Sequence, residues 1–476
     1  MKETVDEIAS LLSVSLPEKK KQSSPLYLSQ AVFDSRKVER GALFFALKGE
    51  KHDGHDFLRE IASLGAGAAV VERSQLSRLP TLPFLTLLPV NSPRESLYRL
   101  AQKIFPQKQC RVLAVSGSFG KSTTKEFLYQ MLSPYRKVEK SPGNYNTDIS
   151  LPTILLNCTR ESWLILEMGV RRKGDMARLV SLAPPEIALL TQVGQAHAEH
   201  FADERELVEE KATLLFHEKT SHAIFPRDLP HLETLLPRIC AHPLSFNCQP
   251  DQGAFSPEKS LWQADQSLYS VRLRLPFDQK TQLSFSIPHE AFLRNGLAAL
   301  ITAHAAGLTW EQIRAQTTGL RLPPHRLQLR RGRGGVTFID DSYNHATLQG
   351  ARVALDLLRR RGKGARKIAL LSEMREQGTQ SAENHRQLAL LALRCADLLL
   401  YLGEPATIEI MDRIWHKKRS SLLYFLEREL FFAQALSLFA SGDWILVKGA
   451  RCYALEELIE EWENFSFSTR EKGGAS

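Results

Sequence analysis

The chain of 476 residues lacks the segments that would place it in a membrane or on an export route. No uninterrupted apolar run approaches the roughly 20 residues that span a bilayer. The opening stretch, MKETVDEIASLLSVSLPEKKKQ, has early acids and lacks the basic, apolar and small-residue order of an export signal. We therefore expect a cytoplasmic protein with no membrane insertion.

Cysteine is scarce, and its spacing excludes two kinds of framework. The chain has six cysteines and no C-x-x-C pair; they are Cys110, Cys158, Cys240, Cys248, Cys395 and Cys452. Neither a zinc site nor a disulfide network fits such scattered positions. The sequence predicts isolated thiols that are buried or half-buried.

Aromatic residues are missing from the basic runs, although the net charge is +9. These runs lie at 329–335, 358–367 and 416–419. Without interleaved aromatics, such runs are more typical of solvated faces than of a nucleic-acid surface. A substrate that carries several phosphates and carboxylates also suits a positive protein. We therefore predict no nucleic-acid partner.

The length exceeds what one hydrophobic core organises, and the pattern predicts an α/β protein of three domains. We place them at 1–106, 107–319 and 320–476. The first mixes short strands with helices and ends in an amphipathic helix at 93–105, which Pro106 terminates.

The second predicted domain alternates strands and helices. Strands are expected at 163–169 and 186–194, with a helix at 204–216. This alternation predicts a mainly parallel sheet with crossover helices. Residues 240–290 lose the pattern and predict short antiparallel strands. A helix is expected at 293–307.

The double proline in LRLPPHR, residues 320–326, predicts the entry to the third domain. Strands are then expected at 335–341, 367–374, 396–403 and 443–449. Helical segments separate them, so this domain is predicted to be Rossmann-like.

The stretch VLAVSGSFGKSTTKE, residues 112–126, has the composition of a phosphate-binding loop between a strand and a helix. Gly117 and Gly120 allow the backbone to bend around oxygens, Lys121 supplies charge, and Ser122 can ligate magnesium. The helix N-terminus also favours anions. Val115 stands where the common motif has its first glycine.

The form SGSFGKST resembles the phosphate loop of the Mur ligase family, [ST]-G-[ST]-x-G-K-[ST]. Further blocks resemble the family in the same order along nearly the whole chain. They are DSRKVERGALFFALKGEKHDGHDF (34–57), SPGNYNTDISLPTILL (141–156), EMG (167–169), TQVGQAHAEHF (191–201), IDDSYNHAT (339–347) and ILVKGAR (445–451).

The resemblance implies an ATP-dependent, ADP-forming amide ligase that acts through an acyl-phosphate. Segments 34–57 and 141–156 are most similar to members that join D-alanyl-D-alanine to UDP-N-acetylmuramoyl-tripeptide. The resemblance also implies Mg²⁺ and a role in peptidoglycan synthesis. We expect a monomer. Two alternatives stay open. One is another amide ligase of the family, either third-residue-adding or a folylpolyglutamate synthase; the other is a basic nucleic-acid-dependent ATPase with this loop. The D-N-P-R string expected of the third-residue-adding ligase is absent.

The family's functional residues carry over to matching positions. Catalytic roles fall on Lys121, Glu167, His197 and Lys211, and metal ligands on Ser122, Glu167, His197 and Lys211. ATP binding falls on Gly117, Ser118, Gly120, Lys121, Ser122, Thr123, Asn295, Arg326, Asp341 and Asn344. Substrate binding falls on Ser35, Arg36, Asn144, Asn146, Lys448 and Arg451.

Lys211 matches a lysine that the family carbamylates with carbon dioxide, which would turn a cation into an anionic oxygen ligand. Its own neighbours give a different expectation, since the residues three and four positions away are all apolar. On that basis alone, its stem would lie along an apolar face while its ammonium reached water.

Several positions depart from the family pattern. Thr147 replaces the second asparagine of an N-N pair, and His325 replaces the glycine before Arg326. Ala291 and Phe292 stand where a His-Asn pair usually contacts adenine. We therefore expect the base to be recognised through stacking and backbone bonds.

Overall fold

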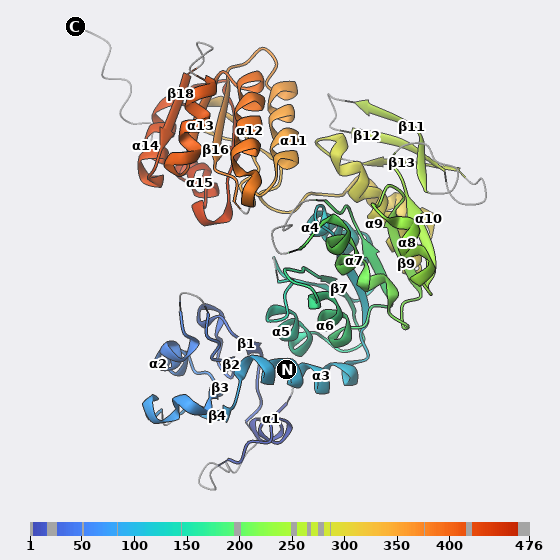
Figure 1. The fold of residues 1–476 in the computed structure, drawn as a ribbon, viewed down its shortest axis with the longest axis vertical. Helices are drawn as coiled ribbons and strands as arrows, with labels where there is room; N and C mark the ends of the chain where they lie inside the picture. Colours follow the sequence, from blue (N-terminus) through green and yellow to red (C-terminus); the bar gives the residue numbers. More distant parts are fainter. Residues whose placement is uncertain are drawn as a thin grey trace.

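The computed structural model describes residues 3–16, 26–49, 52–82, 84–143, 145–194, 201–248, 255–263, 268–274, 280–285, 287–375, 377–415 and 421–464. Figure 1 shows three α/β domains along the long axis, the first in blue, the central one in green and the third in orange and red. The predicted fold class is thereby confirmed. Within the described residues, no helix has the length and apolar character needed to cross a bilayer.

The first domain is built on a small parallel sheet. Its strands occur in the order β1-β2-β3-β4 and comprise β1 (Ala31–Val32), β2 (Leu43–Phe45), β3 (Ala68–Glu72) and β4 (Thr86–Val90). Helices α1 (Val5–Leu11), α2 (Leu58–Ser63) and α3 (Pro93–Ile104) accompany it. The Ser92 hydroxyl accepts a bond from the Glu95 N–H and Pro93 begins α3, so the predicted helix starts at a regular cap.

The central domain has a six-stranded parallel sheet, as predicted. The order is β10-β9-β8-β5-β7-β6, and its strands are β5 (Arg111–Ser116), β6 (Val138–Lys140), β7 (Trp163–Glu167), β8 (Ile187–Leu190), β9 (His222–Pro226) and β10 (His242–Phe246). Its helices are α4 (Lys121–Leu132), α5 (Ser150–Asn157), α6 (Asp175–Leu182), α7 (Glu204–Ala212), α8 (Leu232–Leu235), α9 (Leu293–Ala305) and α10 (Trp310–Thr317). Side chains alternate across the sheet, so Ala114 and Val115 lie in different buried clusters on its two faces.

The prediction of antiparallel strands over residues 240–290 is correct for one part and wrong for another. Strands β11 (Ser256–Gln263), β12 (Leu268–Arg274) and β13 (Lys280–Phe285) form an antiparallel sheet. Strand β10, however, runs parallel to β9. The short helix α8 lies between β9 and β10 and returns the chain, so that β10 extends the main sheet instead of forming a hairpin.

The third domain has strands in the order β14-β15-β19-β16-β17-β18. They are β14 (Gln328–Arg331), β15 (Thr337–Asp340), β16 (Lys367–Ser372), β17 (Leu398–Leu402), β18 (Ser421–Phe425) and β19 (Trp444–Lys448); β14 is antiparallel and the others are parallel. Its helices are α11 (Leu348–Arg361), α12 (Ser381–Cys395), α13 (Pro405–Trp415), α14 (Arg428–Leu438) and α15 (Glu456–Asn464). The boundaries at 106 and 319 stay predictions.

The expectation of isolated cysteines that are buried or half-buried is wrong at four of the six positions. Cys240 and Cys452 are exposed, because both lie in surface connections. Cys110 and Cys158 are neighbours, with their Sγ atoms 3.9 Å apart, because the start of β5 packs near the end of α5.

Candidate active site

The loop between β5 and α4 needs its two glycines. Gly117 and Gly120 have φ of 141° and 81°, a region that side chains rarely adopt. A Cβ on Gly117 would lie 2.1 Å from Thr191 Oγ1, and a Cβ on Gly120 would lie 2.1 Å from Asn295 Nδ2. Val115, at the position of the usual first glycine, is a buried residue of β5. The loop therefore turns later than the common motif and still opens at the N-terminus of α4.

Lys121 folds back over this loop. Its Nζ donates to the carbonyl of Gly117 at 2.8 Å and to that of Ser118 at 3.3 Å. Burial lowers the pKa of Lys121. The nearby Glu167 carboxylate opposes this change, and the Arg326 cation adds to it. A bound phosphate would supply the negative charge that this lysine lacks.

Glu167, the last residue of β7, is the buried carboxylate of the site, with 3% of its surface exposed. Its Oε2 accepts from Ser122 Oγ at 2.9 Å, and its Oε1 accepts from Asn146 Nδ2 at 3.0 Å. Burial alone would raise its pKa, but Lys121, Lys125 and these donors hold the pKa below the usual value. The carboxylate is therefore ionised beside the phosphate loop.

Lys211 lies behind the loop and not in water. Its side chain is 1% exposed, and its Nζ lies 3.4 Å from the Gly117 carbonyl. The expectation that its ammonium would reach solvent is wrong, because the phosphate loop covers the end of this side chain. Burial, with a further contribution from Lys121, lowers its pKa to about 7. Near neutral pH much of this amine is thus uncharged.

The described residues account for part of the predicted metal ligands. His197, a predicted metal ligand, lies outside the described residues, as does Asn144, which was predicted to bind substrate. Within the described ranges, no group of three or more His, Cys, Asp or Glu side chains could hold a metal by itself. A hydroxyl from Ser122 and a carboxylate from Glu167, next to a phosphate loop, nevertheless fit Mg²⁺, which keeps waters and shares phosphate oxygens.

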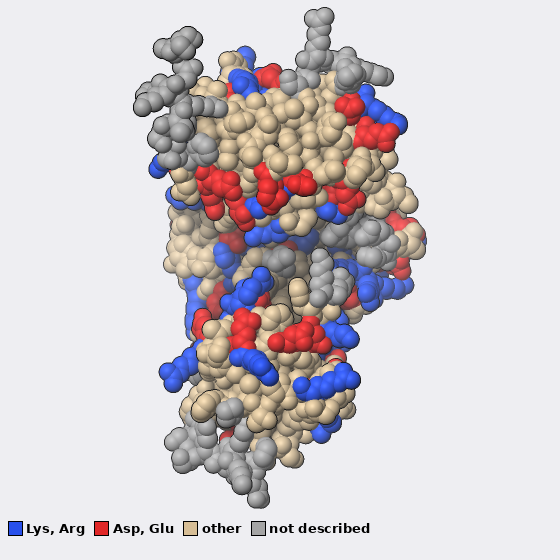
Figure 2. All heavy atoms as spheres, turned by 90° about the vertical axis from the view of Figure 1, so that its left-hand side faces the viewer, with Lys and Arg blue, Asp and Glu red and all other residues tan. Residues whose placement is uncertain are grey.

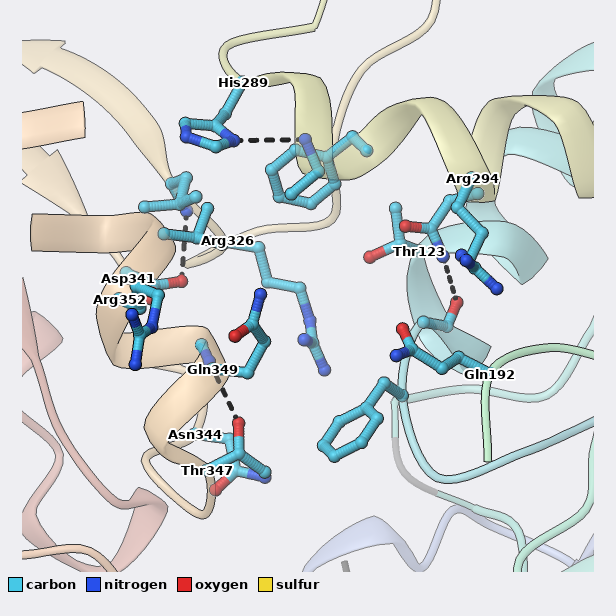
Figure 3. A pocket seen from close by; sticks show the side chains of 18 of the residues that line it. Thr123, Gln192, His289, Arg294, Arg326, Asp341, Asn344, Thr347, Gln349 and Arg352 are labelled. Carbon is cyan, nitrogen blue, oxygen red and sulfur yellow. Dashed lines mark hydrogen bonds between the residues drawn. The ribbon is translucent and has the colours of Figure 1, made fainter. Parts of the chain in front are cut away.

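A cavity of about 1200 Å³ lies between the phosphate loop and α11. Figure 3 shows Arg326 extending into it between Gln349 on one side and Thr123 and Gln192 on the other. Twelve of the predicted residues line it, namely Ser118, Gly120, Lys121, Ser122, Thr123, Asn146, Glu167, Asn295, Arg326, Asp341, Asn344 and Lys448. The central and third domains together thus form the wall.

The third-domain wall is held by a buried ion pair. Lys448 Nζ donates to Asp341 Oδ2 at 2.6 Å and to the Asn344 carbonyl at 3.0 Å. Burial raises the pKa of Asp341 even though Lys448 opposes this change. The Arg326 guanidinium lies 4.5 Å from the centre of the Tyr343 ring, and its Nε has no partner among the described residues. The Nε–H of Arg326 is therefore free to donate a hydrogen bond to a ligand.

The segment before α9, where the family resemblance implies an adenine contact, joins the central and third domains. Phe292 packs against the buried clusters of both the central and the third domain. His289 Nε2 lies 3.1 Å from Asp356 Oδ2 on α11. Asn295 donates to the Gly120 carbonyl at 3.1 Å, so this side chain supports the phosphate loop.

Three predicted substrate residues lie apart from this cavity in the described structure. Ser35 is buried in the first domain. Arg36, on the same turn, is 84% exposed and pairs with Asp34 at 2.9 Å. Arg451 is 66% exposed and pairs with Glu456 at 2.5 Å.

Figure 2 shows a hollow between the first and third domains in which Lys and Arg gather below a band of acidic residues.

Lys125 is a buried site residue that the motif comparison did not single out. It lies one helical turn after Lys121, a spacing that places both lysines on the same side of α4. That spacing was the available signal, and the exposure of Lys125 is 1%.

Comparison with known proteins gives a consistent result along the chain. The family model described as Mur ligase family, catalytic domain, matches residues 31–102. The Mur ligase middle domain matches 115–303, and the model described as Mur ligase, glutamate ligase domain, matches 325–451.

Curated relatives are similar over nearly their whole lengths. A UDP-N-acetylmuramoyl-tripeptide–D-alanyl-D-alanine ligase of Bacillus subtilis is 25% identical over 469 residues, covering 97% of this chain and 98% of the relative. The ligase of the same name from Synechocystis is 29% identical over 447 residues, covering 92% and 93%.

Solved structures agree with the observed architecture. MurF ligase from Thermotoga maritima, in complex with ADP, is 29% identical with a TM-score of 0.74, covering 91% of this chain and 97% of that one. A MurF structure from Acinetobacter baumannii, at 23% identity, has a TM-score of 0.83 and supports the fold. With three family domains matched in order and this architecture shared, the chain belongs to the Mur ligase family.

Proposed function

We propose that the chain is an ATP-dependent ligase that joins D-alanyl-D-alanine to UDP-N-acetylmuramoyl-tripeptide in the cytoplasmic synthesis of peptidoglycan precursors. The observation that carries the proposal is the single cavity that Ser122, Glu167 and Arg326 line together with the phosphate loop. Relatives that carry this ligase name are 25% and 29% identical over more than nine-tenths of the chain.

Amide formation from a carboxylate requires a better leaving group on the carboxyl carbon. The terminal carboxylate of the tripeptide attacks the γ-phosphorus of ATP, giving an acyl-phosphate and ADP. The amine of D-alanyl-D-alanine then attacks the acyl carbon, loses a proton and displaces phosphate. Both steps crowd anions together, so the site must supply positive charge.

The residues of the cavity suit this demand. The N-terminus of α4, Lys121 and Arg326 bind and orient the phosphates, and Asp341 fixes Lys448 beside them. Ser122 and Glu167 would hold Mg²⁺, which when bound offsets phosphate charge. His197 is proposed as a ligand of a second Mg²⁺.

Lys211 is proposed to act as a carbamate. An uncharged amine reacts with carbon dioxide to form a carbamate and release one proton, and the pKa of about 7 leaves such an amine available. The resulting anion would lie behind Gly117, whose carbonyl oxygen is 3.4 Å from the Lys211 Nζ. Carbamylation would thus replace a poorly solvated cation with an oxygen ligand.

The remaining assignments follow the same family pattern. We propose that Ser35, Arg36, Asn144 and Asn146 contact the uridine-nucleotide donor, and that Lys448 and Arg451 contact the acceptor or phosphate. The remainder of the proposed ATP site comprises Gly117, Ser118, Gly120, Thr123, Asn295 and Asn344. We expect a monomer without a nucleic-acid partner.

One assay separates this proposal from its alternatives. Phosphate release is measured with UDP-N-acetylmuramoyl-tripeptide in the presence and absence of D-alanyl-D-alanine, and with a polynucleotide in parallel. The proposal requires dependence on both the muramyl peptide and the dipeptide, with a product whose mass equals their sum less one water. Stimulation by the polynucleotide alone would instead identify a nucleic-acid-dependent ATPase.

A further inference from the structure

Lys125 is a lysine whose side chain is buried in the central domain and has no assigned role in the proposed reaction. It is 1% exposed and ranks among the largest fully buried side chains. A lysine is rarely buried without a partner, since removing its charge from water costs several kcal/mol. The contacts of its ammonium group should therefore show which parts of the structure it stabilises.

The ammonium of Lys125 has two acceptors from different parts of the central domain. Its Nζ donates to the carbonyl of Gly143 at 2.9 Å and lies 3.4 Å from Oε2 of Glu167. The first acceptor belongs to the loop after β6, and the second to the end of β7. One ammonium thus connects α4, that loop and the site carboxylate.

Lys121 and Lys125 lie on one side of α4 but reach in different directions. Lys121 bonds to the carbonyls of Gly117 and Ser118 within the phosphate loop. Lys125 reaches across the sheet edge and, within the part of the chain that the structure describes, makes no hydrogen bond to that loop. The two lysines therefore serve different parts of the site, one the phosphates and the other the carboxylate.

The loop that Lys125 contacts is itself bonded around Glu167. The Glu167 N–H donates to Ser141 Oγ at 2.7 Å, and Asn146 Nδ2 donates to Glu167 Oε1 at 3.0 Å. The Gly169 N–H donates to the Asn146 carbonyl at 2.8 Å. These bonds tie the loop to β7, while the Lys125 bond to Gly143 ties it to α4.

We propose that Lys125 is a positioning residue, which fixes the Glu167 carboxylate and the neighbouring segments 141–143 and 145–147 relative to the phosphate loop. The inference rests on the proposed function, because it assumes that Glu167 and Asn146 serve the ligase reaction. Lys125 acts through these two residues, which line the cavity, and is not itself among the described residues that line it. A cation of fixed position suits this task, because it attracts the carboxylate and a carbonyl at once.

The test compares Lys125→Met with a matched buried lysine outside the site. Lys108 is 6% exposed, and its Nζ donates to the carbonyls of Leu156 and Cys158 at 2.6 and 2.7 Å. Both methionine variants remove a buried charge that bonds to backbone carbonyl groups, but only Lys125→Met removes a cation from beside Glu167. Turnover, the KM for ATP and amide hydrogen exchange are measured in each.

Lys125→Met should lose about a hundredfold in kcat, the scale of a small misplacement at a reacting centre, with KM for ATP within about threefold. Exchange should rise in the peptide over 138–147 and stay unchanged in the sheet of the third domain. Lys108→Met should lose stability but keep its turnover within about threefold. This contrast separates positioning from general destabilisation.

Lys125→Arg keeps the charge and is the second variant if the methionine protein does not fold. It should hold exchange over 138–147 at the wild-type level and keep turnover within about tenfold. Wild-type turnover in Lys125→Met would overturn the proposal. So would a hundredfold loss in either folded variant with unchanged exchange over 138–147. If the wild type itself fails to join the two substrates, the proposed function fails, which is a separate result.

Discussion

Ser122 donates a hydrogen bond of 2.9 Å from its hydroxyl to Oε2 of Glu167, across a sequence separation of 45 residues. The sheet brings them together because β5 and β7 are neighbours and Val115 pairs with Glu167 in register. The loop that follows β5 therefore starts beside the carboxylate that ends β7. Parallel α/β sheets gather ligands at this edge, which explains why a hydroxyl and a carboxylate suited to Mg²⁺ meet here.

Replacing Lys121 with alanine should separate chemistry from folding. The variant loses the charge that faces the transferring phosphoryl group, and we expect turnover to fall by about a hundredfold or more. The melting temperature should change little, because among the described residues the ammonium bonds to two loop carbonyls, those of Gly117 and Ser118. Steady-state phosphate release and calorimetry measure the two effects.

Lys137→Ala is the matched control for that variant, since Lys137 Nζ also donates to a backbone carbonyl, that of Arg160 at 2.7 Å, but on an exposed surface. It should keep full turnover. Normal turnover in the Lys121 variant would remove the proposed role of this lysine.

Local patterns predicted the parallel sheets and the phosphate loop, because both depend on short-range signals. Strand and helix alternation fixed the sheet type, and Gly120 followed by Lys121 marked the loop. The environment of Lys211 could not be predicted, because its covering carbonyl on Gly117 lies 94 residues away. The same holds for Lys125, whose contact with Glu167 depends on the strand order β5-β7-β6. Burial by distant segments has no local signature.

Recognition of the base should be weak in this chain. Phe292 stands where an asparagine is expected, and it packs against both the central and the third-domain clusters. Without a side-chain hydrogen bond that one base alone can satisfy, the penalty for the other base is small. We predict a ratio of kcat/KM for ATP and GTP well below a thousand. A ratio of several thousand would show that another polar group recognises adenine.

The buried amine of Lys211 should make stability depend on pH. An ordinary lysine has a pKa of 10.5, whereas burial lowers that of Lys211 to about 7. Between these values the unfolded chain binds more protons, so the contribution of Lys211 becomes less unfavourable as pH rises from 7 to 10.5. Lys211→Met, which cannot be protonated, should be more stable than the wild type at pH 7 and below. The difference should narrow at pH 9.

Melting temperatures of the two proteins, in buffers free of bicarbonate, measure that difference directly. Comparing them at each pH cancels the titration of all other groups. A gap that widens with pH, or a wild type that is more stable at pH 7, would contradict the assigned environment of Lys211.

The carbamate proposal predicts a rescue that a structural lysine would not show. Lys211→Ala should lose about a hundredfold or more in turnover, the scale for loss of one electrostatic stabiliser, and should leave a space behind Gly117. Formate or acetate could enter that space and supply the missing anionic oxygens, restoring part of the activity. Removing carbon dioxide and bicarbonate should slow the wild type reversibly, whereas the alanine variant should not respond. Full activity in the alanine variant, or a loss that no small carboxylate restores, would show that Lys211 works without carbamylation.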